Sequence, residues 1–263
     1  ETLTPQDFLS FRDRLGTSSG FESWQLRQIE IILCLEQQQR DAGMDPLSHM
    51  KQLNSEGKIS SKVLEEFEAM INSPSLNDLL TNWLYRTPIN GSLPSESADQ
   101  KIVSNYINSH LDAMSEHSKQ VISHFKSIGH GNESTLRERL EKSVESARQF
   151  LIPEGEINRS RAGLLFIESY RNLPLLSWPR ILIDSFVEVE ESILLFRNSH
   201  ARMVERMIGR RMGTGGSSGV DYLDATLKYR IFVDLWSVRT ILVKRELLPD
   251  VANPEYYGFN SQP

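Results

Sequence analysis

The sequence has 263 residues, of which 39% are hydrophobic and 24% charged, so it can bury a sizeable core as a globular protein. Its 29 basic residues stand against 35 acidic ones, and the net charge of −6 argues against a nucleic-acid-binding protein. The single cysteine, Cys34, excludes an internal disulfide and a thiolate-rich metal site.

The sequence pattern also bears on where the protein works. No stretch approaches the roughly 20 consecutive apolar residues that a membrane-spanning helix needs. Residues 1–5 lack the basic and apolar regions of a signal peptide. One cysteine fits a reducing compartment. We therefore expect a cytoplasmic protein with no membrane or nucleic-acid partner.

Helical periodicity runs through almost the whole chain, so the predicted fold class is all-α. Apolar residues at helical spacing predict helices over residues 19–40, 97–126, 135–150, 161–172 and 193–208. A shorter helix is expected after Ser73-Pro74, where Ser suits the cap and Pro the first turn. Neither a sustained alternating strand pattern nor an internal repeat occurs.

The middle of the chain differs in composition from its two ends. Residues 43–150 are the most polar and the least sharply patterned. We therefore predict a mainly helical insertion over 43–150, packed on a helical core formed by 1–42 and 151–263. A separate domain over 43–150 is the less favoured alternative.

The helix predicted over 193–208 carries a histidine on an apolar face. At about 100° per residue, His200 shares its face with Ile193, Phe196, Met203, Val204 and Met207. The imidazole is therefore expected to point into an apolar interior. It fits a core histidine with satisfied hydrogen bonds. It also fits an axial ligand of haem iron, because a flat porphyrin suits a face lined by Met and Phe. Periodicity alone leaves both interpretations open.

A glycine-rich segment follows this helix. Residues 213–219 read Gly-Thr-Gly-Gly-Ser-Ser-Gly, and glycines let backbone amides approach a ligand closely. Because no Lys-Ser/Thr pair follows the glycines, the segment is not a phosphate-binding P-loop. By itself such a segment is more often a linker than a binding site.

Two separated groups of residues carry a family resemblance. The first is Leu3-Thr4-Pro5, Asp7-Phe8, Phe11-Arg12, Ser19-Gly20-Phe21 and Arg27-x-x-Glu30. The second is His200, Met203-Val204, Arg206, Ile208-Gly209, 213–219, Tyr222-Leu223 and Phe232-Val-Asp-Leu-Trp236. In this order they resemble the tryptophan 2,3-dioxygenase family. In the middle of the chain, Trp83-Leu84-x-Arg86-Thr87-Pro88 is the clearest likeness.

The resemblance implies a haem-binding helical bundle with a helical insertion. His200 would be the proximal iron ligand of haem b, with Phe196 and Met203 lining the cofactor. Ser19 would lie near the haem edge. The substrate would be L-tryptophan, and its indole would pack on Phe8.

The polar end of that substrate has its own implied partners. Arg12 would hold the carboxylate, for which a planar guanidinium is well suited. Thr214 would bond the same end, with Gly213 and Gly215 letting the segment fold over it. From spacing alone, a surface ion pair of Arg12 with Asp7 or Asp13 is favoured instead.

The implied activity is oxidative cleavage of the indole C2–C3 bond by O₂ to N-formylkynurenine, in the kynurenine pathway of tryptophan catabolism. A homotetramer is implied as well. The family's distal histidine lies in a segment that precedes the Phe8–Arg12 helix, so we expect a separate N-terminal segment or chain to complete the site. No catalytic residue is assigned within this sequence. The alternatives are a haem monooxygenase acting on an indole amino acid in secondary metabolism, and a non-catalytic helical interaction protein.

Three further patterns receive a structural interpretation. His110, His117 and His124 recur every seven residues, too far apart along a helix to share an ion, and are expected to form a solvated stripe. Glu188, Glu190 and Glu191 are expected on an exposed helix face. Asp224 departs from the resemblance, because the family usually carries a basic residue there, and the change could alter loop or subunit contacts.

Overall fold

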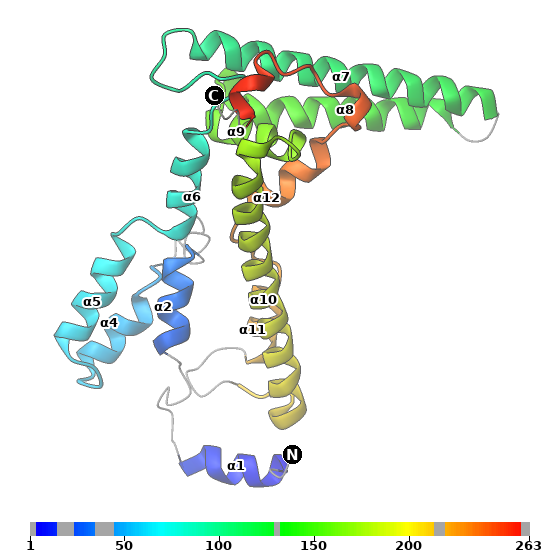
Figure 1. Ribbon diagram of the computed structural model, residues 1–263. Coiled ribbons are helices and arrows are strands. Elements are labelled where there is room, and N and C mark those ends of the chain that lie inside the picture. Colours follow the sequence, from blue (N-terminus) through cyan, green and yellow to red (C-terminus); the bar gives the residue numbers. More distant parts are fainter. Residues whose placement is uncertain (1–3, 15–23, 35–44, 129–131, 213–218, 259–263) are drawn as a thin grey trace. The chain divides into compact units, whose positions relative to one another are not determined.

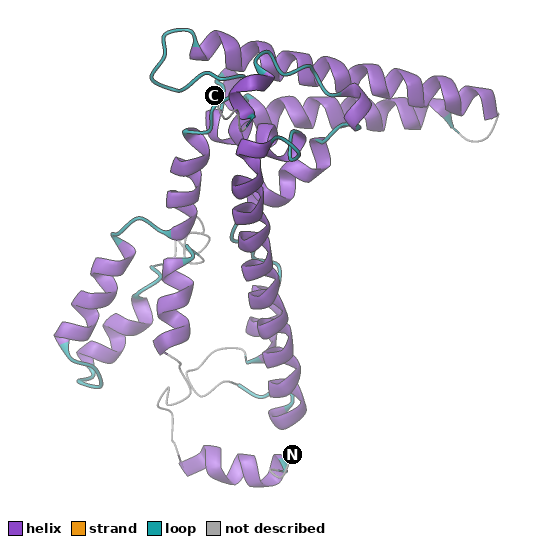
Figure 2. Cartoon of the chain, in the orientation of Figure 1, coloured by secondary structure: helices purple, strands orange, loops and turns teal. Residues whose placement is uncertain are grey.

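The computed structural model describes residues 4–14, 24–34, 45–128, 132–212 and 219–258 (Figure 1). Helices make up almost all of its regular structure (Figure 2). Within the described ranges no strand forms, and the one β-bridge joins Ile89 to Ser92. The predicted all-α class is confirmed. None of the described helices has the length and apolar character needed to cross a membrane.

Two compact units divide the chain. The first contains Glu1–Asp78 and Phe186–Phe232, and the second contains Leu79–Ser185 and Val233–Pro263. Two of the three internal divisions fall within helices, because α6 (Leu76–Tyr85) and α10 (Ser177–Ile208) each contribute residues to both units, and the third falls between Phe232 and Val233. These boundaries are not those of the insertion predicted over 43–150, which stays a prediction.

The first unit contains six helices or parts of helices within its described residues besides the start of α6. They are α1 (Pro5–Arg14), α2 (Trp24–Ile32), α4 (Ser48–Ser55), α5 (Ser61–Ile71), the later part of α10, and α11 (Val220–Thr226). Helices α2, α4 and α5 enclose a core of Ile31, Leu47, Met50, Leu53, Ile59 and Phe67. The weakly patterned segment after residue 43 thus forms two short helices around apolar residues that are far apart in sequence.

Helix α2 ends earlier than its periodicity predicts. The predicted helix ran from residue 19 to residue 40, whereas the described helix closes at Ile32 with a turn in which Cys34 N–H donates to Ile31 O at 2.9 Å. Cys34 has a φ of 69°, a left-handed conformation that a helix does not continue through. Residues 19–23 and 35–40 of the prediction lie outside the described residues.

The start of α6 corrects the predicted cap. Ser75 Oγ accepts a hydrogen bond from Asp78 N–H at 3.1 Å, while the Asp78 carboxylate accepts from Ser75 N–H at 2.9 Å. This reciprocal pair satisfies two backbone donors at the helix start. The expected helix after Ser73-Pro74 is confirmed, but its cap is Ser75 because Asp78 lies three residues later.

The second unit is built on an antiparallel pair of long helices, visible in Figure 1 as α7 and α8. They are α7 (Asp99–Ile128) and α8 (Glu133–Leu151), and both pack with α9 (Arg159–Ser169). Helix α12 (Val233–Ser237) packs on the turn that follows it, η3. The 3-10 turns are η1 (Pro153–Gly155), η2 (Pro174–Leu176), η3 (Val238–Ile241), η4 (Arg245–Leu247) and η5 (Pro254–Tyr257). The helices predicted over 97–126, 135–150 and 161–172 are confirmed with shifted ends.

Helix α9 is the centre of the second unit, since ten consecutive positions from 159 to 168 include nine buried residues. Gly163 lies where another element passes closely. A Cβ at this position would come within 2.4 Å of the Leu84 carbonyl oxygen and 3.1 Å of Thr87 Cβ. A side chain larger than hydrogen therefore does not fit there.

The expected solvated histidine stripe is wrong at His110. This side chain is fully buried, and its Nε2 lies 2.8 Å from Ile241 O. Burial lowers the pKa of His110, so the ring is neutral and Nε2 carries the proton that it donates to the carbonyl. His124 is exposed as expected, and His117 is half-buried.

Candidate functional site

The part of α10 around His200 has a buried side and an open side. Ala201 and Glu190 are fully buried, whereas Phe196 and Met203 are 50% and 57% exposed. His200 is half-buried between these two sides. The sequence pattern predicted that the whole apolar face is enclosed. The described residues of this chain leave it open, so His200 borders an apolar surface and does not reach into a closed interior.

The imidazole of His200 lies against Phe196, one turn earlier. Their ring centroids are 6.0 Å apart and the rings are nearly parallel, with an interplanar angle of 23°. Among the described residues no hydrogen bond reaches either ring nitrogen of His200. His110 is the internal contrast, because it is enclosed and bonded to a carbonyl as a core histidine is expected to be.

These features fit the haem group that the resemblance implies. A porphyrin needs a flat apolar surface and one axial nitrogen from the protein, and it supplies the other ligands of its iron itself. The open stripe of Phe196 and Met203 beside His200 offers such a surface. Within the described ranges no three His, Cys, Asp or Glu residues come together as a metal site.

Glu190 corrects a second expectation. It was expected on an exposed face with Glu188 and Glu191, yet its side chain is fully buried. Its carboxylate oxygens accept hydrogen bonds from the backbone N–H groups of Ile231 and Phe232, at 2.9 and 3.1 Å. Three acidic residues in four positions suggested a solvated face, but this carboxylate has backbone donors inside the first unit.

A polar cluster joins α2 and α11 to α10 just before His200. Arg197 donates to the Glu30 carboxylate at 2.9 Å and to Thr226 O at 3.2 Å. Glu30 belongs to the Arg27-x-x-Glu30 pattern of the resemblance, but no role could be assigned to it from that pattern. The burial of its partner Arg197 could not be predicted from the sequence, because an arginine on a helix is ordinarily a surface residue.

Asp224 has a defined partner in the first unit. Its carboxylate accepts a hydrogen bond from Arg202 of α10, and nearby Asp221 accepts one from Arg210. The acidic residue that departs from the family pattern thus binds α11 to α10 in this chain. Whether it alters substrate or subunit contacts stays a prediction.

The residues proposed for substrate binding are partly described. Arg12 on α1 donates to the backbone oxygen of Met212, the residue that precedes the glycine-rich segment. Its surface ion pair with Asp7 or Asp13 is absent among the described residues, and Asp7 is instead bonded to Thr4. Phe8, one turn before Arg12, is half-buried. Ser19, Gly213, Thr214 and Gly215 lie outside the described residues.

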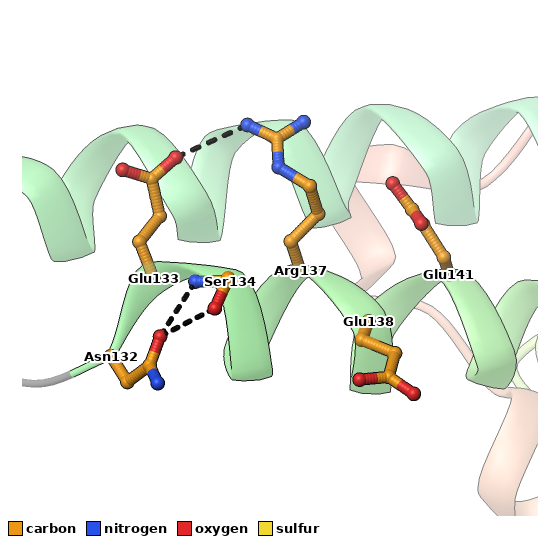
Figure 3. A pocket seen from close by; sticks show the side chains of 6 residues that line it. All are labelled: Asn132, Glu133, Ser134, Arg137, Glu138 and Glu141. Carbon is orange, nitrogen blue, oxygen red and sulfur yellow. Dashed lines mark hydrogen bonds and ion pairs between the residues drawn. The ribbon is translucent and has the colours of Figure 1, made fainter.

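A surface depression on the second unit is a poor candidate. It runs along the start of α8 and is lined by Asn132, Glu133, Ser134, Arg137, Glu138 and Glu141 (Figure 3). Glu133 accepts from Arg137 at 3.2 Å, and hydrogen bonds from Lys126 and Arg137 lower the pKa of this carboxyl. These interactions pair neighbouring charges, the lining contains no histidine or cysteine, and the Ser134 hydroxyl donates to Asn132 Oδ1 at 2.6 Å as part of the helix cap.

An all-α fold with an imidazole on an open apolar helix face is compatible with a haem-binding protein. A sequence model of the family described as tryptophan 2,3-dioxygenase matches residues 1–242. The chain belongs to the tryptophan 2,3-dioxygenase family.

Individual relatives agree with the family match. A tryptophan 2,3-dioxygenase-like protein of Xanthomonas campestris pv. campestris (strain 8004) is 40% identical, with 98% of each chain covered. The tryptophan 2,3-dioxygenase of Sorangium cellulosum is 42% identical over 98% of this chain and 65% of its own. Tryptophan 2,3-dioxygenase 2 of Ralstonia nicotianae is 41% identical over 98% of this chain and 73% of its own.

Proposed function

We propose that this chain catalyses the haem-dependent oxidative cleavage of the indole C2–C3 bond of L-tryptophan by O₂, giving N-formylkynurenine in the kynurenine pathway. Family membership supports haem-dependent oxidation of tryptophan. The observation in this chain that carries the proposal is the half-buried His200 beside the open apolar surface of Phe196 and Met203. A cytoplasmic location is part of the same proposal.

In this proposal His200 is the axial ligand of haem b. The haem supplies the chemistry of O₂ activation, and the protein contributes binding, orientation and exclusion of water. Phe196 and Met203 would pack on the macrocycle and remove their exposed apolar area from water. Ser19 is proposed near the haem edge.

Arg12 is proposed to bind the carboxylate of tryptophan. Its guanidinium donates a hydrogen bond to the backbone oxygen of Met212, which directly precedes Gly213. Thr214 is proposed to bond the same polar end, with Gly213 and Gly215 allowing close backbone approach. Phe8 lies one turn from Arg12 on α1 and is proposed to pack on the indole ring.

The assembly is also part of the proposal. A homotetramer is supported by large apolar side chains exposed on the second unit, such as Trp178 and Ile181. The distal histidine of the family is proposed to come from a segment or chain N-terminal to α1. Substrate cleavage therefore needs that segment present in the tested protein.

The decisive experiment is reconstitution with haem followed by anaerobic reduction and spectroscopy. We expect a Soret band that shifts when L-tryptophan is added, and a product that contains two oxygen atoms from ¹⁸O₂ after oxygen is admitted. His200→Ala should lose the Soret band, whereas His110→Gln on the second unit should keep it. One labelled oxygen atom would instead indicate a monooxygenase. No haem binding by the wild-type chain with its N-terminal segment would indicate a non-catalytic helical protein.

Arg12→Met tests the substrate-binding part of the proposal. Removing a charge-assisted bond to a carboxylate should weaken tryptophan binding by about 1.5–3 kcal/mol, roughly 10- to 150-fold. The Soret shift titrated with tryptophan gives this affinity directly. Arg14→Met, exposed on the same helix, is the matched control and should bind tryptophan as the wild type does. Equal affinities of the two variants would remove Arg12 from the substrate site.

A further inference from the structure

A partly buried ion pair lies one helical turn before His200. Arg197 of α10 and Glu30 of α2 approach to 2.9 Å, and their side chains are only 11% and 22% exposed. Thr226 O takes a second hydrogen bond from the same guanidinium at 3.2 Å. The Arg197 guanidinium is therefore bonded to both α2 and α11. Because the pair is partly buried, water screens its charges less than it screens surface charges.

The surroundings of Glu30 make its charge decisive for the cluster. Arg27 also faces this carboxylate, at 3.4 Å, and donates to Pro46 O. Burial and then the charge of Glu30 raise the pKa of the phenol of Tyr222 on α11. Two guanidinium groups thus surround one carboxylate. The cluster carries a net charge of about +1. Without the Glu30 carboxylate, its net charge would be about +2.

The cluster is close to His200 along the helix. Residues 197 and 200 are three positions apart on α10, and such pairs have Cβ atoms roughly 5–6 Å from one another. Arg197 turns towards α2 and α11, whereas His200 borders the open apolar stripe. The charge is therefore beside the imidazole without bonding to it.

We propose that the Glu30–Arg197 pair sets the reduction potential of the iron that His200 binds. This inference rests on the proposed function, in which His200 is the axial ligand. A positive charge near the iron disfavours the ferric state, which carries one more positive charge than the ferrous state. Arg197 therefore favours the ferrous form that binds O₂, and Glu30 offsets this effect. Both are positioning residues that act through the field at the ligand.

A second ion pair on the same helix provides a matched comparison. Arg202 of α10 pairs with Asp224 of α11, but their side chains are 47% and 34% exposed. The chemical types are the same and Arg202 is also near His200 in sequence. Because water screens exposed charges, this pair should contribute little to the potential.

The test is a one-electron spectroelectrochemical titration of the haem-loaded protein in four variants and the wild type. Glu30→Gln should raise the midpoint and Arg197→Gln should lower it. Each shift should change the ferrous-to-ferric ratio at the wild-type midpoint about tenfold, or ~59 mV, as one part-buried charge does at an effective dielectric near 20. The double variant should return close to the wild-type midpoint. Asp224→Asn should leave the midpoint unchanged.

Structural damage would give a different pattern. If the pair only held the helices together, the two single variants would shift the midpoint in the same direction and the double variant would deviate most. That result, or a shift from Asp224→Asn as large as that from Glu30→Gln, overturns the inference. Failure of the proposed function is distinguishable, because the wild-type protein would then show no Soret band to titrate.

Discussion

Arg159 is bonded entirely inside the second unit. Its Nε and Nη2 donate to the two carboxylate oxygens of Asp99 at 2.7 and 2.9 Å. Its remaining bonds go to the backbone oxygens of Tyr85, Thr87 and Ser92, at 2.7, 3.0 and 3.3 Å. These carbonyls lie at the end of α6 and in the connection to α7. One side chain therefore fixes that connection to the start of α9.

Removing the charge of Asp99 should destabilise this arrangement. Asp99→Asn leaves the buried guanidinium without its counter-charge, so we expect the free energy of unfolding to fall by about 3 kcal/mol. Urea denaturation measures it. Asp112→Asn, exposed on the same helix, should change stability by less than about 0.5 kcal/mol. Similar losses in both variants would mean that the ion pair contributes nothing beyond helix electrostatics.

His110 should make stability depend on pH. Burial lowers the pKa of His110, so on acidification the unfolded chain takes up this proton before the folded chain does. The histidine's contribution is thus fully present above about pH 6.5 and is lost as the pH falls through the lowered value. His110→Gln can keep a donor to Ile241 O and should flatten the fall between pH 8 and 5. His124→Gln on the exposed part of α7 should retain the wild-type slope, and parallel curves for all three proteins would contradict the assignment.

At the scale of the element, α9 depends on the absence of a side chain. Gly163→Ala improves intrinsic helix propensity by about 1 kcal/mol but places Cβ 2.4 Å from the Leu84 carbonyl. Because the obstacle is backbone, we expect a net loss of about 2–3 kcal/mol, as overpacking causes. Thermal unfolding checks this.

Gly57→Ala is the control for that variant. Its Cβ would meet no atom within 4 Å, although φ is +71°. It should cost only the roughly 1 kcal/mol of a left-handed alanine. A smaller loss for Gly163→Ala than for Gly57→Ala would show that α6 and α9 adjust to the added methyl group.

The sequence predicts those helices that carry a regular apolar pattern. Helices α7, α8 and α9 were predicted with ends displaced by a few residues, because long periodic segments specify their own burial. Helices α4 and α5 were not placed individually, since their core forms only when Ile31 and Phe67 meet across the chain. The end of α2 at Ile32 depends on a left-handed Cys34 that no residue preference indicates.

Some features of the candidate site and of its surroundings could also be predicted from the sequence, and others could not. His200 with Phe196 and Met203 could be selected from spacing and the family resemblance. The burial of Glu190 and His110 could not, because each depends on a backbone group supplied by a distant segment, namely Ile231 N–H and Ile241 O. Glu30 and Arg197 are 167 positions apart, so no local pattern indicates that they form a pair.

At the scale of the whole molecule, the exposed aromatic residues favour self-association. Trp178 is 62% exposed and lies edge-on to Trp83, with ring centroids 6.0 Å apart, and Ile181 is exposed one turn later. Soluble monomers rarely leave such apolar residues together in water. If the proposed homotetramer buries them, Trp178→Ser should lower the molar mass measured by light scattering at micromolar concentration.

The control for this assembly test is Lys119→Ser on α7, whose side chain is 74% exposed. It replaces a solvated cation and should leave the molar mass unchanged. A wild-type mass equal to one chain, or a Trp178→Ser mass equal to that of the wild type, would remove this surface from the proposed interface.

The buried carboxylate of Glu190 has a consequence for how sequence changes are tolerated. It binds the backbone at Ile231 and Phe232, so the chain runs on through the rest of α10 and through α11 and returns to Glu190 41 residues later. Residues 191–230 thus form a segment whose two ends are held together by Glu190. Lengthening such a segment changes its closure entropy slowly, by about 0.6 kcal/mol for each doubling. Insertions between α10 and α11 should therefore leave the attachment of residues 231 and 232 to Glu190 intact, and their main effect should fall on the segment that contains the proposed substrate-binding residues.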